Sequence, residues 1–196
     1  MISPESRSIE WITEAANRIG VHDVALVDVP KRHAKFFYTV SYPGNGGSDK
    51  ILLDVLFEDA HYAKIVSKPI KSPLLLIEEP DVMVNLPSHE DLLGDKLTAF
   101  APHTTGIPFF KKEKKCTMEI IKQLFDVASL FDITDDLTVT RETFTRFAAV
   151  ELQYRHLNPN DIRLVLDDIF QSALCICMRG AQNPEEFQLF KDGSAV

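Results

Sequence analysis

The spacing of apolar side chains predicts a helix followed by strands in the first part of the chain. Residues 4–19 carry apolar side chains at helical spacing, and Gly20 follows where a helix commonly ends. The apolar positions of this helix are Ile9, Ile12, Ala16 and Ile19. Runs rich in β-branched and aromatic residues then predict strands at 24–29, 35–42 and 51–59, and one or two more within 74–79 and 81–87.

The pattern changes to helical spacing beyond Pro87. Ser88 can cap a helix, with Asp91 three residues further on, as is typical of helix starts. Three more helices are predicted to begin at Thr117, at Thr140 and near Asn158. The third of these is expected to run to Gly180, and a short last helix from Asn183 ends near Gly193.

These elements predict an α+β fold. We expect a mixed sheet with flanking helices over residues 1–87, followed by a helical domain over residues 88–196. The sequence NLPS, which contains Pro87, is the expected hinge between the two.

Composition restricts the class of protein. The 196 residues are 45% hydrophobic and 26% charged, which excludes a disordered or collagen-like chain. We expect a cytoplasmic protein, because there is no apolar run of transmembrane length and no secretion signal at the first residues. The net charge of −8 argues against a broad nucleic-acid-binding face. Residues 111–115, KKEKK, are either a solvated loop or a local phosphate or RNA contact.

The three cysteines are expected to be reduced core residues. Cys175 and Cys177 lie in an apolar helical run, and neither these nor Cys116 completes the spacing of a zinc site.

Asp54 interrupts an apolar strand. The sequence ILLDVLFED, residues 51–59, is typical of a buried strand, yet a carboxylate lies at its centre. An unpaired carboxylate is unfavourable in an apolar setting, so we expect Asp54 to be paired, hydrogen-bonded or bound to metal. Its partner could be Lys96 or a backbone N–H, in a purely structural contact.

Lys96 lies inside the apolar stripe of the helix that follows Ser88. At about 100° per residue, its side chain falls among those of Leu92, Leu93, Leu97 and Phe100. A lysine there must reach the edge of the stripe, pair with a carboxylate, or bind a ligand phosphate. The acidic residues of this helix are expected on the solvated faces: Glu90, Asp91 and Asp95.

The next helix carries a lysine and an aspartate four residues apart. Lys122 and Asp126 lie opposite its core stripe and could form a surface ion pair. Phe125, Leu130 and Met118 flank them with apolar side chains, so the pair could instead be half-buried beside a cleft.

Taken in order, these motifs resemble the nucleotidyltransferase-like toxins of the AbiEii abortive-infection family, within the polymerase-β-like superfamily. The resemblance covers about residues 50–157. It implies that Asp54 completes an acidic metal site, that Lys96 faces the nucleotide, and that Lys122 and Asp126 support the site. Mg²⁺ and a nucleoside triphosphate are the cofactors that the resemblance implies.

The chain also departs from the family pattern. Gln123 stands where the family usually has aspartate, and His103 lies where an arginine is expected. In the family a Gly-Gly or Gly-Ser turn at a helix start, and then a strand with two acidic residues one apart, precede the strand carboxylate. Here the only glycine cluster, GNGG at residues 44–47, lies in a hairpin-like turn, and Asp23 and Asp28 do not form an acidic pair one residue apart. We therefore expect a chain that is catalytically incomplete by itself, either truncated or degenerate. If it is truncated, its sheet exposes an edge, and we expect a homo-oligomer or poor solubility.

Three functions are compatible with these observations. In its complete form, the first would transfer a nucleoside monophosphate to an RNA or protein acceptor, with Asp54, Lys96 and Asp126 as the catalytic residues. The second is a non-catalytic module that binds a nucleotide or an antitoxin protein. The third is an unrelated acid–base enzyme that uses one of three histidines, His61, His89 or His103; no nucleophile motif accompanies them.

Overall fold

The computed structural model describes residues 24–27, 33–41, 47–57, 59–71 and 82–194. The chain divides into two compact units, residues 1–60 and 61–196. The described residues contain five helices together with small antiparallel sheets, so the predicted α+β class is confirmed. The predicted domain boundary at residue 87 stays a prediction.

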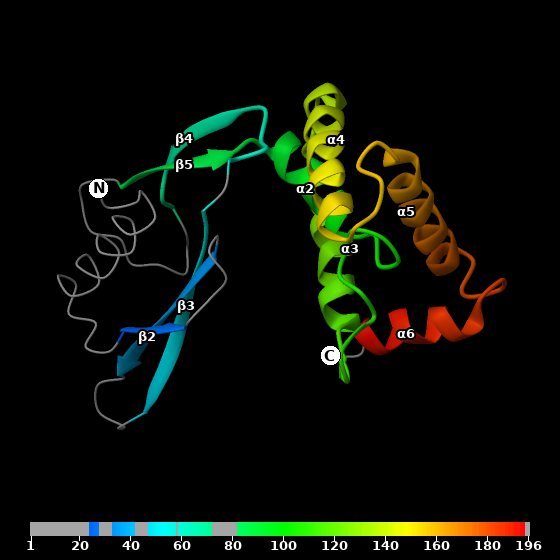
Figure 1. The fold of residues 1–196 in the computed structure, drawn as a ribbon, viewed down its shortest axis with the longest axis horizontal. Helices are drawn as coiled ribbons and strands as arrows, with labels where there is room; N and C mark the ends of the chain where they lie inside the picture. Colours follow the sequence, from blue (N-terminus) through cyan, green and yellow to red (C-terminus); the bar gives the residue numbers. More distant parts are fainter. Residues whose placement is uncertain (1–23, 28–32, 42–46, 58, 72–81, 195–196) are drawn as a thin grey trace. The chain divides into compact units, whose positions relative to one another are not determined.

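The first unit contains a three-stranded antiparallel sheet. Its strands are β1 (Val24–Val27), β2 (His33–Ser41) and β3 (Ser48–Leu56), in the order β1-β2-β3. Three of the predicted strands are therefore confirmed, with ends displaced by a few residues. The predicted helix over residues 4–19 lies outside the described residues. Figure 1 shows β2 and β3 side by side.

The interpretation of β3 as a buried strand is wrong. Ile51 and Leu52 point to opposite faces of the sheet, and they are 59% and 47% exposed. Within the described sheet, β3 is an edge strand that pairs with β2 alone. Among the side chains of this sheet whose burial is described, Ala34 and Phe36 are buried, and they share one face of β2.

The second unit begins with a strand pair and continues as helices. β4 (Ile65–Pro69) pairs antiparallel with β5 (Met83–Pro87). β5 lies within the predicted strand 81–87, whereas β4 was not predicted because Lys68 and Pro69 interrupt its apolar pattern. The predicted strand at 74–79 lies outside the described residues.

The structure describes five helices in this unit, and three of them start where the sequence predicts, whereas the starts of α4 and α5 differ. They are α2 (His89–Ala99), α3 (Thr117–Phe131), α4 (Leu137–Tyr154), α5 (Ile162–Cys177) and α6 (Pro184–Ser194). α4 begins before Thr140 because Asp136 accepts a hydrogen bond from the Thr138 N–H. α5 begins after Asn158 because Asp161 accepts from the Leu164 N–H.

Two apolar clusters form the core of the helical unit. One joins the end of α2 to α3, α5 and α6, and its buried members are Phe100, Phe109, Ile120, Cys175 and Phe190. The other joins α4 to α5, and its buried members are Ala101, Phe144, Ala148, Leu152 and Val165. α6 packs against the first turns of α3, where Gly193 lies close to the Thr117 carbonyl (Figure 1).

The cysteines are free, as predicted, but they are not all core residues. Cys116 and Cys175 are buried, whereas Cys177 is exposed. Two residues apart on α5, Cys175 and Cys177 point about 200° apart around the helix, so only one of them faces the core.

Gly94 allows α2 to pack closely against α4. A methyl group at this position would lie 2.7 Å from the carbonyl oxygen of Thr140 and 2.8 Å from the backbone nitrogen of Phe144. Backbone atoms cannot move aside as a flexible side chain can. The absence of a side chain at Gly94 therefore sets the distance between the two helices.

Gly94→Ala is expected to lower the free energy of unfolding by about 2 kcal/mol. The cost of forcing a methyl group between two helix backbones is larger than the stabilisation that alanine gives through its higher helix propensity. Urea denaturation followed by circular dichroism measures the change. The control is Ser129→Ala on the exposed side of α3, which should change stability by less than about 0.5 kcal/mol. Equal stability of Gly94→Ala and the wild type would contradict the close packing.

Candidate functional site

The candidate site is built around α2, whose start is fixed by a buried carboxylate. Asp91 is 0% exposed, so its predicted place on a solvated face is wrong. Its carboxylate accepts hydrogen bonds from the backbone N–H groups of Ala63 at 2.6 Å and Lys64 at 3.0 Å. It also accepts from the hydroxyl groups of Ser88 at 2.8 Å and of Thr143 on α4. Four donors replace the water that burial removes.

The hydrogen bonds keep Asp91 ionised. Burial by itself raises the pKa of this carboxyl, but the hydrogen bonds from Thr143, Ser88, Ala63 and Lys64 together hold it below its ordinary value. Ser88 also accepts from the Asp91 N–H, as the predicted helix cap requires. Asp91 is therefore a structural residue that joins α2 to α4 and to the segment before β4.

Asp95 lies one turn further along α2, and its environment raises its pKa, whereas that of Asp91 is lowered. It was expected on a solvated face, but it is partly buried and accepts a hydrogen bond from the Tyr62 hydroxyl at 3.1 Å. Burial raises the pKa of Asp95, and the Tyr62 hydrogen bond and the nearby Lys96 charge offset this only in part. The Tyr62 ring is held in turn against Phe147 of α4, with ring centroids 5.0 Å apart. Raised carboxyl pKa values of this kind are common in functional sites, although structural networks also produce them.

Lys96 connects α2 to α3. Its Nζ lies 2.9 Å from Oδ2 of Asp126 and donates to Oε1 of Gln123 at 3.1 Å. The sequence predicted that this lysine needs a partner, and α3 supplies two of them. The side chains of Lys96 and Asp126 remain 32% and 40% exposed, so solvent and small ligands can reach the pair.

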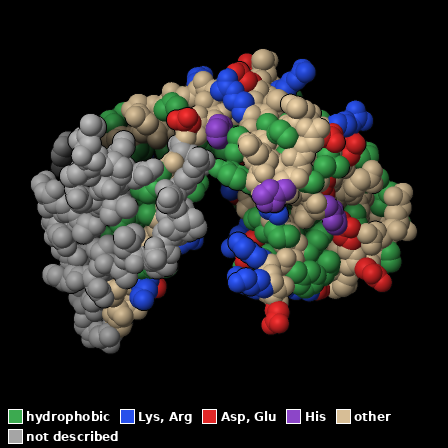
Figure 2. Space-filling model, in the orientation of Figure 1, with side chains coloured by type: hydrophobic (Ala, Val, Ile, Leu, Met, Phe, Trp, Pro, Cys, Tyr) green, Lys and Arg blue, Asp and Glu red, His purple; other side chains and the backbone are tan. Residues whose placement is uncertain are grey.

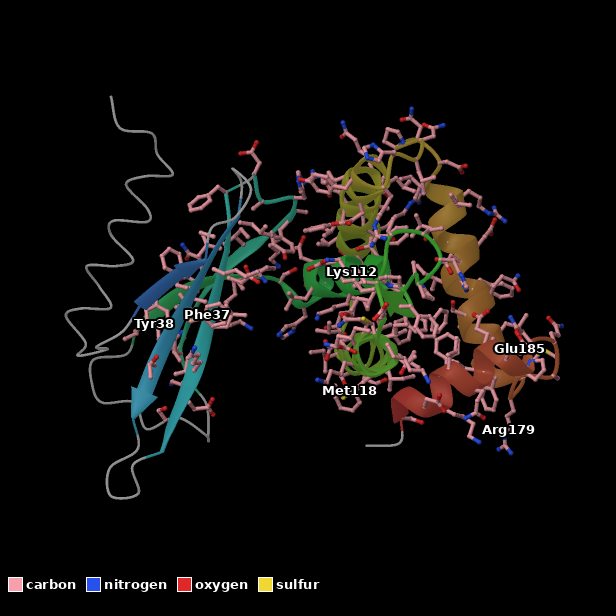
Figure 3. The ribbon with its side chains drawn as sticks, turned by 60° about the horizontal axis from the view of Figure 1, so that its bottom comes forward. Phe37, Tyr38, Lys112, Met118, Arg179 and Glu185 are labelled. Atoms are coloured by element: carbon pink, nitrogen blue, oxygen red, sulfur yellow. The ribbon has the colours of Figure 1, made fainter. Side chains whose placement is uncertain are left out.

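Lys122 is exposed on α3, and Asp126 pairs with Lys96 instead of forming the predicted surface pair within α3. The apolar neighbours of Lys122 are also accessible. Phe125 is 72% exposed and Met118 is 37% exposed. Figure 3 shows Met118 on the outer side of α3, and Figure 2 shows hydrophobic side chains on the visible face of the helical unit.

Asp54 belongs to the first compact unit, where it has a cationic neighbour. Lys35 lies opposite it on β2, and the Lys35 Nζ is 3.1 Å from Oδ2 of Asp54. The Asp54 side chain is 45% exposed, so it is not the desolvated carboxylate that the strand pattern suggested. Asp54 and Lys96 belong to different compact units, so the site that the sequence predicts them to share stays a prediction.

The described residues do not by themselves form a metal site. None of them belongs to a group of three or more His, Cys, Asp or Glu side chains that could hold a metal ion. A magnesium ion needs several oxygen ligands. Asp54 provides one carboxylate, and its neighbour Lys35 is a cation that cannot act as a ligand.

Two of the three candidate histidines, His61 and His103, make contacts of a structural kind. The His61 ring packs edge-on against Phe147, and His103 Nε2 lies 3.2 Å from Glu186 Oε1, joining the segment after α2 to α6. His103 also donates its backbone N–H to Asp168. His89, at the start of α2, is exposed.

In the part of the chain described here, no helix is both long and apolar enough to cross a membrane.

Comparison with known proteins adds one finding. A family model described as "Nucleotidyl transferase AbiEii toxin, Type IV TA system" matches residues 4–193. Neither the comparison with curated proteins nor that with solved structures gave a match. The family match spans nearly the whole chain, including α2 and α3.

Asp95→Asn is expected to change the pH dependence of stability. Because burial raises the pKa of Asp95, the folded protein keeps a proton that the unfolded chain releases above about pH 4. Wild-type stability therefore falls as pH rises from that value through the folded pKa, and asparagine removes this loss. The variant should gain stability relative to the wild type between pH 4 and pH 7, measured by urea denaturation.

Asp167→Asn is the matched control for this experiment, because Asp167 is exposed on α5. Its stability difference from the wild type should change little over the same pH range. A stability difference for Asp95→Asn that is the same at pH 4 and pH 7 would show that burial does not perturb this carboxyl.

Proposed function

Because the chain belongs to the AbiEii family of nucleotidyl transferase toxins from type IV toxin–antitoxin systems, we propose that its helical unit binds the triphosphate of a magnesium–nucleoside triphosphate through Lys96. Asp126 and Gln123 hold the lysine, and Lys122 adds positive charge on the exposed side of α3. The observation that supports this most is the contact between the predicted lysine of α2 and the predicted aspartate of α3.

The geometry of Lys96 suits a nucleotide phosphate. An ammonium group has three N–H donors, and Asp126 and Gln123 accept from two directions, so the third can point to a ligand oxygen. Asp126 fixes the position of Nζ before the ligand arrives, which lowers the entropy lost on binding. Both side chains are partly exposed, so phosphate can approach without unfolding the helices.

The reaction we propose for the complete site is transfer of a nucleoside monophosphate to a hydroxyl group of an RNA or protein. The acceptor oxygen forms a bond to the α-phosphorus, the bond between that phosphorus and the bridging oxygen breaks, and pyrophosphate leaves. Asp54 is the residue we assign to the acceptor proton or to the metal of the substrate. Since this chain lacks the family's Gly-Gly/Ser turn and Asp-x-Asp strand, we propose nucleotide binding with little or no turnover by the chain alone.

A second candidate function is a binding module for an antitoxin protein. Exposed apolar side chains on α5 favour it, since Leu166 is 48% and Phe170 is 61% exposed and both lie on one face of the helix. The family description names a toxin–antitoxin system, which supports a partner protein of this kind. Formation of a homo-oligomer, also predicted from the sequence, can be measured by light scattering.

Titration calorimetry with magnesium and each nucleoside triphosphate tests the proposed function. Lys96→Ala is expected to weaken binding at least about tenfold, because a charge-assisted hydrogen bond to phosphate is lost. Asp126→Ala should weaken it less, through loss of lysine positioning, and Asp54→Ala should weaken it only if the two units share the site. Arg146→Ala, an exposed cation on α4, is the control and should bind like the wild type.

The Lys96 and Asp126 variants are expected to stay folded, so that a loss of affinity reports on the site. The Lys96–Asp126 pair is about one-third exposed and should contribute less than about 1 kcal/mol to stability, which urea denaturation of each variant checks. Wild-type protein that binds none of the four triphosphates would overturn the proposal and leave the antitoxin-binding module. Equal binding by Lys96→Ala and Arg146→Ala would exclude Lys96 from the site.

A further inference from the structure

A cavity of about 470 Å³ opens beside α2, and apart from Lys111 of the basic run 111–115 its lining residues belong to none of the sequence motifs. It lies between the second half of α2, the segment 105–108, the short hairpin of β6 (Phe110–Lys111) and β7 (Lys114–Lys115), and the end of α4. Its volume is in the range of small-molecule sites and is far larger than a single ion requires. All of its lining residues belong to the second compact unit.

The cavity offers hydrogen-bond acceptors, donors and apolar walls together. Its charged lining consists of Asp95, Glu151, Lys111 and Arg155, and its apolar walls include Ile107 and Pro108. Carboxylates accept hydrogen bonds only, whereas ammonium and guanidinium groups donate only. A matching ligand is therefore a flat or apolar group whose edge carries both N–H donors and carbonyl or ring-nitrogen acceptors.

Two of these side chains are held in place before a ligand binds. Arg155 donates through Nη2 to the carbonyl oxygens of Gly106 at 2.8 Å and Thr105 at 3.3 Å, which fixes its guanidinium at the cavity wall. Asp95 is held by the Tyr62 hydroxyl at Oδ2, and a carboxylate has further lone pairs for a ligand donor. Pre-positioned groups of this kind give specificity, because they are left unpaired when the wrong ligand binds.

The cavity begins next to the residue that we assign to the triphosphate. Asp95 and Lys96 are consecutive on α2, so their Cα atoms are about 3.8 Å apart and their side chains leave the helix about 100° apart. Lys96 does not line the cavity, so a nucleotide that contacts both residues must extend around α2, with its phosphates at Lys96 and its base in the cavity.

We infer that this cavity is a nucleobase pocket in which Asp95 accepts a hydrogen bond from an exocyclic amino group, so that the protein selects amino-bearing bases over uracil. The inference rests on the proposed triphosphate binding at Lys96. Cytosine, adenine and guanine each present an amino group, whereas uracil presents carbonyl oxygens at the corresponding edge. A carboxylate attracts the amino group and repels the carbonyl oxygen, and Arg155 and Lys111 can donate to the ring acceptors. The partial desolvation that raises the Asp95 pKa also strengthens its interaction with a donor.

Matched nucleotide pairs test this inference by titration calorimetry with magnesium. CTP and UTP differ at the base edge that carries the amino group, as do ATP and ITP. The wild-type protein is expected to bind CTP at least about tenfold more tightly than UTP, and ATP more tightly than ITP. Asp95→Asn should reduce the preference for the amino-bearing member of each pair, because an amide can donate to a carbonyl oxygen as well as accept.

Glu151→Gln is the second variant and should reduce the same preference, which keeps the test valid if Asp95→Asn folds poorly. Asp132→Asn, an exposed carboxylate at the end of α3, is the matched control and should keep the wild-type preference. Equal affinity for CTP and UTP in the wild type, or an unchanged preference in both pocket variants, would overturn the base pocket. In that outcome a loss of binding in Lys96→Ala still supports the triphosphate site, whereas no binding of any nucleotide overturns both.

Discussion

The helical unit depends on the hydrogen bonds around the Asp91 carboxylate. One buried carboxylate accepts from the segment before β4, from the residue that caps α2, and from a hydroxyl of α4. A buried charge is tolerated only when such donors surround it, so the three segments must be in place together. The positions of Asp95 and Lys96 follow from this arrangement, because both lie on the helix that Asp91 fixes.

Each of three charged residues on α2 serves a different neighbour. Asp91 joins the helix to α4, Asp95 contacts Tyr62 beside the cavity, and Lys96 reaches across to α3. Asp91 and Asp95 are four residues apart and therefore lie on the same face of α2, one turn from each other, where both contact the segment 62–64. Lys96 leaves the helix about 100° from Asp95 and reaches α3 instead. α2 is therefore at once a structural element of the core and the carrier of both proposed nucleotide contacts.

Local signals in the sequence were sufficient to predict the helix starts at Ser88 and Thr117. They also predicted that Lys96, inside an apolar stripe, requires a partner. The face of α2 that carries Asp91, Gly94 and Thr98 was not predictable in this way, because polar and small residues on a helix ordinarily face solvent. Here they pack against α4, where Thr143 donates to Asp91 and Gly94 lies close to the α4 backbone. Spacing rules also paired Asp126 with Lys122 within one helix, whereas the partner came from another helix. The cavity could not be predicted at all, since its walls come from segments distant in the sequence.

The close approach of α2 and α4 at Gly94 has a consequence for the shape of the cavity beside α2. With backbone within contact distance of backbone, the two helices cannot slide or separate by a fraction of an ångström without losing their packing. The cavity lies further along the same two helices, at Asp95, Thr98 and Ala99 and near the end of α4, so its helical walls are held at the spacing that Gly94 sets. We therefore expect the spacing of α2 and α4 to stay unchanged when a ligand binds, so that any adjustment of the cavity falls on its other lining residues, 105–108 and Lys111.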